Sequence, residues 1–190
     1  MPLRGQSYEQ FSNKPKLIIF DAYTTKLHSE MRHEKLEIDY QVFSSIDELE
    51  PLDRELALEA IKAQTGSYAP YSGYNVGSAI RLTSGRIITG SNQENNASPA
   101  GLCAERTAMF YAHAHWPDEP MEEIAIAGGP GFTLDDEPAT PCGQCRQVMA
   151  EFQTAGKHPL AILMVGKKEI WKFGKVDDIL PFIFDGYKPK

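Results

Sequence analysis

The sequence reads CAE at residues 103–105 and PCGQC at residues 141–145. These two stretches hold all three cysteines of the chain, which are Cys103, Cys142 and Cys145. Three thiolates can bind a zinc ion and leave its fourth tetrahedral position for water, as in a catalytic rather than a structural zinc site. The adjacent carboxylate of Glu105 can exchange protons with that water. We therefore predict a catalytic zinc site that holds one zinc per chain.

Two alternatives to an open zinc site remain at this point. A closed structural site needs a fourth protein ligand. A helix running on from the first motif takes His113 and His115 out of reach, because ten residues of helix span about 15 Å. His158 lies beyond the end of a second helix, whereas His28 and His33 are not excluded by their spacing. A disulfide fits less well, because it leaves one of the three cysteines unpaired.

The composition is that of one globular domain with an acidic net charge. The 190 residues are 42% hydrophobic, which is enough to bury a core. A formal net charge of −7 opposes binding to nucleic acid, because proteins that bind polyanions present a basic surface. The early apolar run at residues 17–20 is too short for a signal peptide or a membrane span. We therefore expect a cytoplasmic protein that binds neither nucleic acid nor membrane.

Residues 1–44 carry no motif and alternate only weakly, so we predict an N-terminal arm or extension followed by a domain over residues 45–190. In that domain, SIDE at residues 45–48 resembles a capping box, and Pro51 suits a first helical turn, which together predict a helix over 46–65. The other predicted elements are a hairpin of strands at 76–82 and 86–89, helices at 103–114 and 143–155, buried strands at 124–127 and 160–165, and an edge strand at 169–173.

Both cysteine motifs fall at predicted helix N-termini, where free backbone amides favour the thiolate form. Residues two apart on a helix face apart, so Cys103 and Glu105 can meet at one metal only if Cys103 lies at the very start of the first turn. Glu105 would otherwise be an ordinary first-turn acid. Three thiolates leave a zinc site with a charge of about −1. Arg106 and Arg146, singly or together, would offset this negative charge by donating hydrogen bonds to the thiolate sulfurs. The alternative is that both are solvated surface side chains.

Four motifs in this order resemble the cytidine deaminase family in its small, three-cysteine, homotetrameric form. They are PYSGYNVG at 70–77, NQEN at 92–95, CAERTA at 103–108 and PCGQCRQ at 141–147. The resemblance covers about residues 45 to 185 and includes the signature of the zinc deaminases. It implies an α/β fold, a three-layer α/β/α sandwich around a mixed sheet. It also implies a homotetramer whose subunits share active sites.

The resemblance further implies a reaction, the hydrolytic deamination of cytidine to uridine, and of deoxycytidine, with release of ammonia, as in pyrimidine salvage. Zinc held by Cys103, Cys142 and Cys145 lowers the pKa of water, and Glu105 carries protons to the ring nitrogen and the departing ammonia. The backbone amide of Ala104 is expected to bind the pyrimidine carbonyl of the nucleoside substrate.

The remaining substrate contacts are likewise implied by the resemblance. The Thr140 carbonyl accepts a hydrogen bond from the amine, and Tyr74 lines the base pocket. Asn92 and Glu94 bind ribose hydroxyls, unless they only cap the loop that follows the predicted strand. Phe184, the last aromatic of LPFIF at the C-terminus, stacks on the base in a neighbouring subunit's site, and packing in its own core is the alternative.

Two departures from the family pattern affect the breadth of substrates. The chain has NNAS at residues 95–98, so that Ser98 stands near a position where the family commonly has tyrosine. The loop at 128–140 is long and acidic. The alternatives are a deaminase of amine-modified cytidines, of a free base or of an aminonucleoside, and a zinc-stabilised binding module without catalysis.

Overall fold

The structure is a computed structural model that describes residues 32–186. All of its helices and strands lie in one compact unit that begins at Ile38. Residues 32–37, which belong to the other unit, form neither helix nor strand. Within 32–186 no helix has the length and apolarity needed to cross a bilayer.

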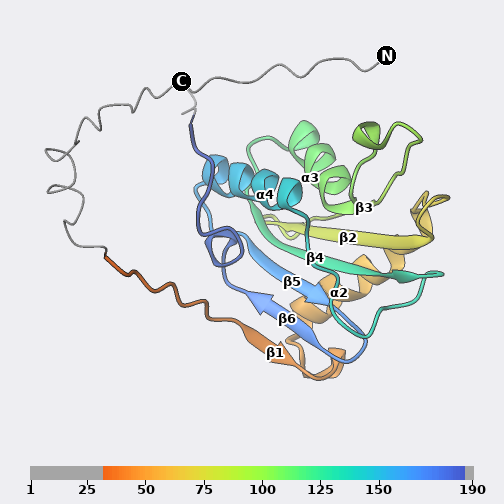
Figure 1. Ribbon diagram of the computed structural model, residues 1–190, viewed down its shortest axis with the longest axis horizontal. Helices are drawn as coiled ribbons and strands as arrows, with labels where there is room; N and C mark the ends of the chain where they lie inside the picture. Colours follow the sequence, from red (N-terminus) through yellow and green to blue (C-terminus); the bar gives the residue numbers. More distant parts are fainter. Residues whose placement is uncertain (1–31, 187–190) are drawn as a thin grey trace, which may run out of the picture. The chain divides into compact units, whose positions relative to one another are not determined.

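Six strands form one mixed sheet in the order β1-β6-β5-β4-β2-β3 (Figure 1). β4 and β5 run parallel, and every other neighbouring pair is antiparallel. Parallel neighbours need a crossover connection, and α4 supplies it between β4 and β5. The strands are β1 (Gln41–Phe43), β2 (Tyr74–Leu82), β3 (Ile87–Ser91), β4 (Met121–Pro130), β5 (Ala161–Val165) and β6 (Ile170–Phe173).

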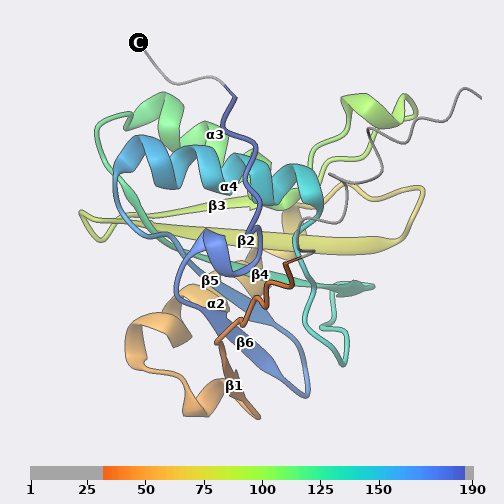
Figure 2. The ribbon, with the colours of Figure 1, turned by 60° about the vertical axis from the view of Figure 1, so that its left-hand side comes forward.

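Helices cover both faces of this sheet, which confirms the predicted three-layer sandwich (Figure 2). α2 (Pro51–Ala63) packs on one face, and α3 (Ala104–His115) and α4 (Gly143–Gly156) pack on the other. Leu56 of α2 and Met149 of α4 are fully buried. Burying one such side chain contributes about 1.5 to 3 kcal/mol, so both faces add to the stability of the fold.

A glycine allows α3 to lie directly on β3. A Cβ atom built on Gly90 would come within 2.6 Å of the Ala108 nitrogen and 2.7 Å of the Ala104 oxygen. Real Cβ atoms do not approach backbone so closely, so only glycine fits at this position. The first turn of α3, which carries the CAE motif, is thereby held against the sheet.

Two of the predicted elements differ in the structure. Pro51 does begin α2, but Ser45 caps a separate 3₁₀ turn, Ile46–Glu48, by accepting a hydrogen bond from the Asp47 amide. β6 is not an edge strand, because β1 pairs with it and takes the edge. Three residues of weak alternation are too few to identify such a strand from sequence.

Residues outside the predicted domain thus contribute to the sheet. Tyr40 stacks on Phe173 of β6 with ring centroids 4.9 Å apart, directly before β1 begins. Residues 1–31 lie outside the described part of the chain, and so do 187–190. The division into an arm of residues 1–44 and a domain of residues 45–190 therefore stays a prediction.

Candidate active site

The three cysteines meet where two helices begin. Cys103 is the N-cap of α3 and Cys142 is the N-cap of α4, as the sequence predicts. The Cys142 Sγ lies 3.9 Å from the Cys103 Sγ and 3.5 Å from the Cys145 Sγ, and all three sulfurs lie within 4.8 Å of one another. Zinc–sulfur bonds of about 2.3 Å in a tetrahedron put sulfurs about 3.8 Å apart, so these donors fit one zinc ion.

The histidines near α3 do not join this cluster. His115 Nδ1 lies 2.9 Å from the Tyr111 carbonyl oxygen, and the His113 ring packs on Phe152 with centroids 4.8 Å apart. Both sit in the last turn of α3, at the opposite end from the cysteines. His28 lies outside the described residues. Among residues 32–186, the side chains that could together bind a metal are the three cysteines alone.

The environment of the cysteines favours one thiolate strongly. Interaction with the Cys145 thiol lowers the pKa of Cys103 to about 5, against the opposing effect of burial, and Arg106 contributes in the same direction. The same contact with Cys103, together with burial, raises the pKa of Cys145. A cation placed among the three sulfurs would favour the thiolate form of each, since metal binding displaces thiol protons.

Glu105 lies beside this cluster in the first turn of α3 and is only 4% exposed. Burial raises its pKa to about 7, and the negative charge of Cys103 acts in the same direction. The side chain lines the same cavity as Cys103 and Cys142. Because Cys103 precedes the helix as its N-cap, the two side chains share one end of the cavity, which meets the condition set by their spacing.

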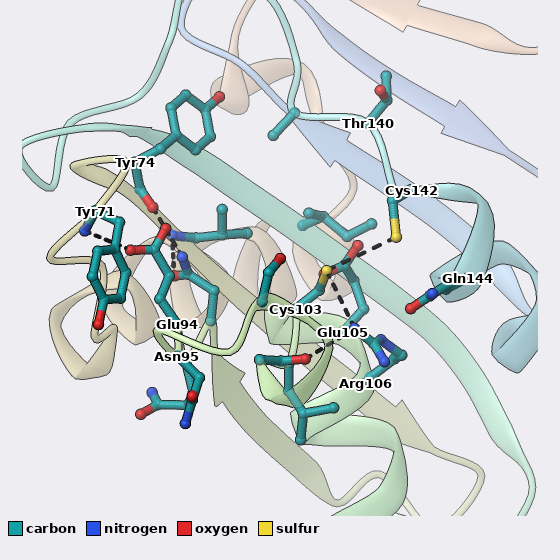
Figure 3. A pocket seen from close by; sticks show the side chains of 18 of the residues that line it. Tyr71, Tyr74, Glu94, Asn95, Cys103, Glu105, Arg106, Thr140, Cys142 and Gln144 are labelled. Carbon is teal, nitrogen blue, oxygen red and sulfur yellow. Dashed lines mark hydrogen bonds between the residues drawn. The ribbon is translucent and has the colours of Figure 1, made fainter.

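A cavity of about 1090 Å³ opens from the cysteine cluster (Figure 3). Cys103, Cys142, Glu105 and Thr140 lie at one end of this cavity, and Glu94 and Tyr71 lie away from that end. Small-molecule sites typically enclose about 300 to 1,000 Å³ and combine apolar walls with a few converging polar groups. This cavity can therefore take a small polar molecule with its reactive atom next to the thiol cluster.

Comparison with known proteins agrees with this site. The family described as "Cytidine and deoxycytidylate deaminase zinc-binding region" matches residues 51–158, which include both cysteine motifs. The chain belongs to this family. The match confirms the predicted family and zinc cofactor, and it makes the chain a zinc-dependent hydrolytic deaminase. A non-catalytic zinc-stabilised module is accordingly set aside.

Individual members of the deaminase family support the same conclusion. The chain is 42% identical to a cytidine deaminase of Halalkalibacterium halodurans over 102 residues, or 53% of this chain and 72% of the relative. It is 40% identical to that of Sporosarcina psychrophila over 98 residues, or 52% of this chain and 68% of the relative. The crystal structure of cytidine deaminase from Burkholderia pseudomallei superposes with a TM-score of 0.60 and 34% identity, over 68% of this chain and 97% of that one.

The two arginines suggested as partners of the deaminase thiols differ in their placement. Arg106 Nη2 lies 3.9 Å from the Cys103 Sγ and 3.5 Å from the Gly101 carbonyl oxygen. Arg146 instead donates to the Pro141 oxygen at 2.9 Å and to the Ile179 oxygen at 3.0 Å. The structure thus brings Arg106 to the thiols, while Arg146 joins the loop before Cys142 to the C-terminal segment.

Glu94 is held by the loop before β2. Its Oε2 accepts hydrogen bonds from the backbone amides of Tyr71 at 2.8 Å and Ser72 at 3.3 Å. Interaction with the Ser72 side chain lowers the pKa of Glu94 most, and the two backbone amides act in the same direction, so the carboxylate stays ionised at neutral pH. The side chain of Glu94 also lines the cavity.

Asn92 is more engaged by the protein than the sequence alone indicates. Its Oδ1 accepts a hydrogen bond from the backbone amide of Val76 at 2.8 Å, and its Nδ2 donates one to the backbone carbonyl oxygen of Tyr74 at 2.9 Å. The side chain therefore continues the backbone hydrogen bonding of β2. A carboxamide has two N–H donors, so one remains for a ligand.

The other predicted contact residues divide between the cavity and the surface. Tyr74 and Thr140 line the cavity, and Ala104 is buried as the first residue of α3, where its backbone amide has no partner within the helix. Phe184 is 69% exposed and is not part of the cavity wall. Asp135 also lines the cavity but is not predicted individually. The acidic run at 135–137 was the only signal for it.

Proposed function

We propose that this chain deaminates cytidine to uridine, and deoxycytidine likewise, with release of ammonia. The observation that carries the proposal is a buried carboxyl group, Glu105, beside three zinc-binding thiols at the end of a cavity that a nucleoside can enter. The relatives described above, which are named cytidine deaminases, support the same substrate.

Glu105 acts in this proposal as the proton carrier. Cys103, Cys142 and Cys145 would hold the zinc ion, which when bound would lower the pKa of water and supply a nucleophile at neutral pH. The Glu105 carboxylate takes one proton from the attacking water and delivers it to the ring nitrogen. It then takes the second proton from the hydroxyl added to the base and passes it to the amine, which leaves as ammonia. One water is consumed and one ammonia released, so the atoms balance.

Two backbone groups beside the metal end orient the base. The free amide of Ala104 at the start of α3 donates to the pyrimidine carbonyl. The Thr140 carbonyl accepts from the amine that will leave. Ala104 directly follows Cys103, and Thr140 lies two residues before Cys142, so both backbone groups would hold the base close to the zinc-binding cysteines.

The charges of the cavity favour an uncharged nucleoside over a nucleotide. Its acidic lining residues are Glu94, Glu105, Asp135 and Glu137, and its one basic lining residue among those described is Arg106. Arg106 is already directed at a thiol and a carbonyl. A phosphate would therefore meet carboxylates without a cation to offset them, whereas a ribose hydroxyl can donate to Glu94 and accept from the remaining N–H of Asn92.

Recognition of ribose predicts strong preference for the nucleoside over the free base. Sites that hydrogen-bond a substrate hydroxyl can reject analogues without it by about 10⁴ to 10⁵. Because water can fill an empty sugar site, we expect the kcat/KM of cytidine to exceed that of cytosine by at least about 10³. The loss of ultraviolet absorbance as the amine is removed measures both reactions.

Glu94→Ala should lower kcat/KM for cytidine by about 10- to 100-fold, the value of a hydrogen bond to a charged group, and leave cytosine unaffected. Glu122→Ala, at an exposed position near the start of β4, serves as the control. Comparable rates on cytidine and cytosine would assign the chain to base deamination and remove the sugar-binding role of Asn92 and Glu94. Turnover confined to an amine-substituted cytidine or to an aminonucleoside would favour those alternatives.

A homotetramer with shared active sites is part of the proposal. The cavity lies at the upper end of the usual size of small-molecule sites, and Phe184 does not line the cavity of its own chain. Gln147 Nε2 donates to the Phe184 carbonyl oxygen at 2.9 Å, which ties the aromatic segment to α4. A neighbouring copy that inserted this ring would narrow the cavity around the base.

Phe184→Ala should therefore raise KM for cytidine by about 5- to 150-fold, the value of stacking one base on an aromatic ring, without removing zinc. Phe182→Ala is the matched control, since Phe182 lies in the same segment and is more exposed. Light scattering should give a mass well above the 21.2 kDa of one chain. A fully active monomer would refute the shared site. A cytoplasmic location and a place in pyrimidine salvage complete the proposed function.

A further inference from the structure

Tyr74 and Asp135 form a hydrogen bond across the wall of the cavity. Tyr74 is the first residue of β2, and Asp135 lies in the loop between β4 and α4. The Tyr74 hydroxyl donates to Asp135 Oδ2 at 3.2 Å, and both residues line the cavity. Burial and then the Asp135 carboxylate raise the pKa of Tyr74, so the phenol remains a donor at neutral pH. The ring is thus anchored at both ends, by β2 and by the loop.

The position of Asp135 is itself fixed by the backbone. Its amide donates to the Gly128 oxygen at 3.0 Å, and its carbonyl accepts from the Lys167 amide at 2.8 Å. A Cβ atom on Gly129 would come within 2.6 Å of the Asp135 nitrogen and 2.2 Å of the Thr133 oxygen. The loop therefore lies against β4 at a place where only glycine fits, and it presents the carboxylate from a set position.

The neighbouring acid in the same loop points elsewhere. Asp136 pairs with Lys168 at 2.6 Å, in the turn between β5 and β6, and it does not line the cavity. Asp135 and Asp136 thus carry the same charge, one residue apart, but have different partners, and only Asp135 lines the cavity. Comparing substitutions of these two residues therefore separates the effect of losing the cavity contact from the effect of losing a negative charge.

We propose that Asp135 is a positioning residue for nucleoside binding, holding the Tyr74 ring as a preset wall of the cavity. The inference rests on the proposed function, since it concerns how that substrate is bound. A tyrosine without this anchor would have to give up side-chain freedom when the substrate arrives, which weakens binding. Ordering one such side chain corresponds to about a 3- to 10-fold change in affinity. The contact therefore acts on KM more than on kcat.

The test is a double-mutant cycle on cytidine turnover. Asp135→Ala and Tyr74→Phe should each raise KM by about 3- to 10-fold, with kcat within about twofold and the zinc content unchanged. The double variant should be no worse than either single variant, because both remove the same contact. Asp135→Asn should recover most of the affinity, since its amide oxygen still accepts the bond. Asp136→Ala should match the wild type.

Each other outcome has a definite meaning. If Asp135→Ala behaves like Asp136→Ala, or if the losses in the double variant multiply, the positioning role is wrong while cytidine deamination stands. If Asp135→Ala lowers kcat and zinc content together, the loop is structural and the inference also fails. If the wild type does not turn over cytidine at all, the proposed function is refuted, and this inference is refuted with it.

Discussion

Glu105→Gln is expected to lower the turnover of cytidine by about 10⁴-fold and to leave both zinc and the fold in place. A single general acid–base group contributes about 10² to 10⁴, and Glu105 is assigned more than one proton transfer, so we expect the upper end of this range. Glutamine keeps the size of the side chain and its fit in a site that is 4% exposed, but it cannot carry a proton. Single-turnover absorbance and elemental analysis of zinc would measure the two quantities together.

Glu151→Gln provides the matched control, because it makes the same change at an exposed position of α4. It should leave turnover unchanged. A Glu105→Gln protein that lost zinc, yet kept normal activity per bound zinc, would make Glu105 a structural residue. The proton transfers would then have to be assigned to another group.

The second large effect concerns the metal ligands. Cys145→Ala should remove zinc and abolish turnover, because Cys145 is fully buried with its sulfur 3.5 Å from that of Cys142. Metal binding energy is also folding energy, so the variant should unfold at a lower temperature than the zinc-loaded protein. When zinc is present at about 1,000 times its dissociation constant, its binding stabilises the folded protein by about 4 kcal/mol. For a chain of this size, losing that stabilisation lowers the melting temperature by roughly 8 to 16 °C.

The zinc-free wild type, prepared with a chelator, separates loss of metal from loss of packing. Its melting temperature by calorimetry should lie close to that of Cys145→Ala, and zinc should restore the wild type but not the variant. Full zinc occupancy in Cys145→Ala, at close to one ion per chain by elemental analysis, would overturn the ligand assignment.

Local spacing is the reason that the metal centre could be predicted from sequence. Cys103 and Cys142 each stand directly before a helix. The geometry of the first helical turn sets the direction of the side chains there, so no contact between distant segments is needed to predict it. The buried strands β4 and β5 could be recognised for a similar reason, because a continuous apolar run between glycine or proline residues indicates a strand covered on both faces.

Contacts between distant segments could not be predicted in this way. The pairing of β1 with β6 depends on residues about 130 positions apart, and Tyr74 meets Asp135 across 61 positions. The amide of Asn92 shows a further limit. Its sequence position predicts a polar group at a strand end, but only the structure shows that β2 backbone groups occupy much of its hydrogen-bonding capacity.

β1 also bears on the solubility of the protein. Without it, β6 would present the unpaired backbone groups of IWKF, an apolar strand of the kind that recruits other chains into aggregates. β1 covers that strand with a segment of only three residues, which is itself too short to template further pairing. Lys172 of β6 adds a second safeguard, since it points inward to Asp53 at 2.5 Å and Glu123 at 3.3 Å, and an inward-pointing charged residue disfavours further pairing at a strand edge. An expression clone trimmed to the catalytic region alone would lose the first of these protections and keep the second.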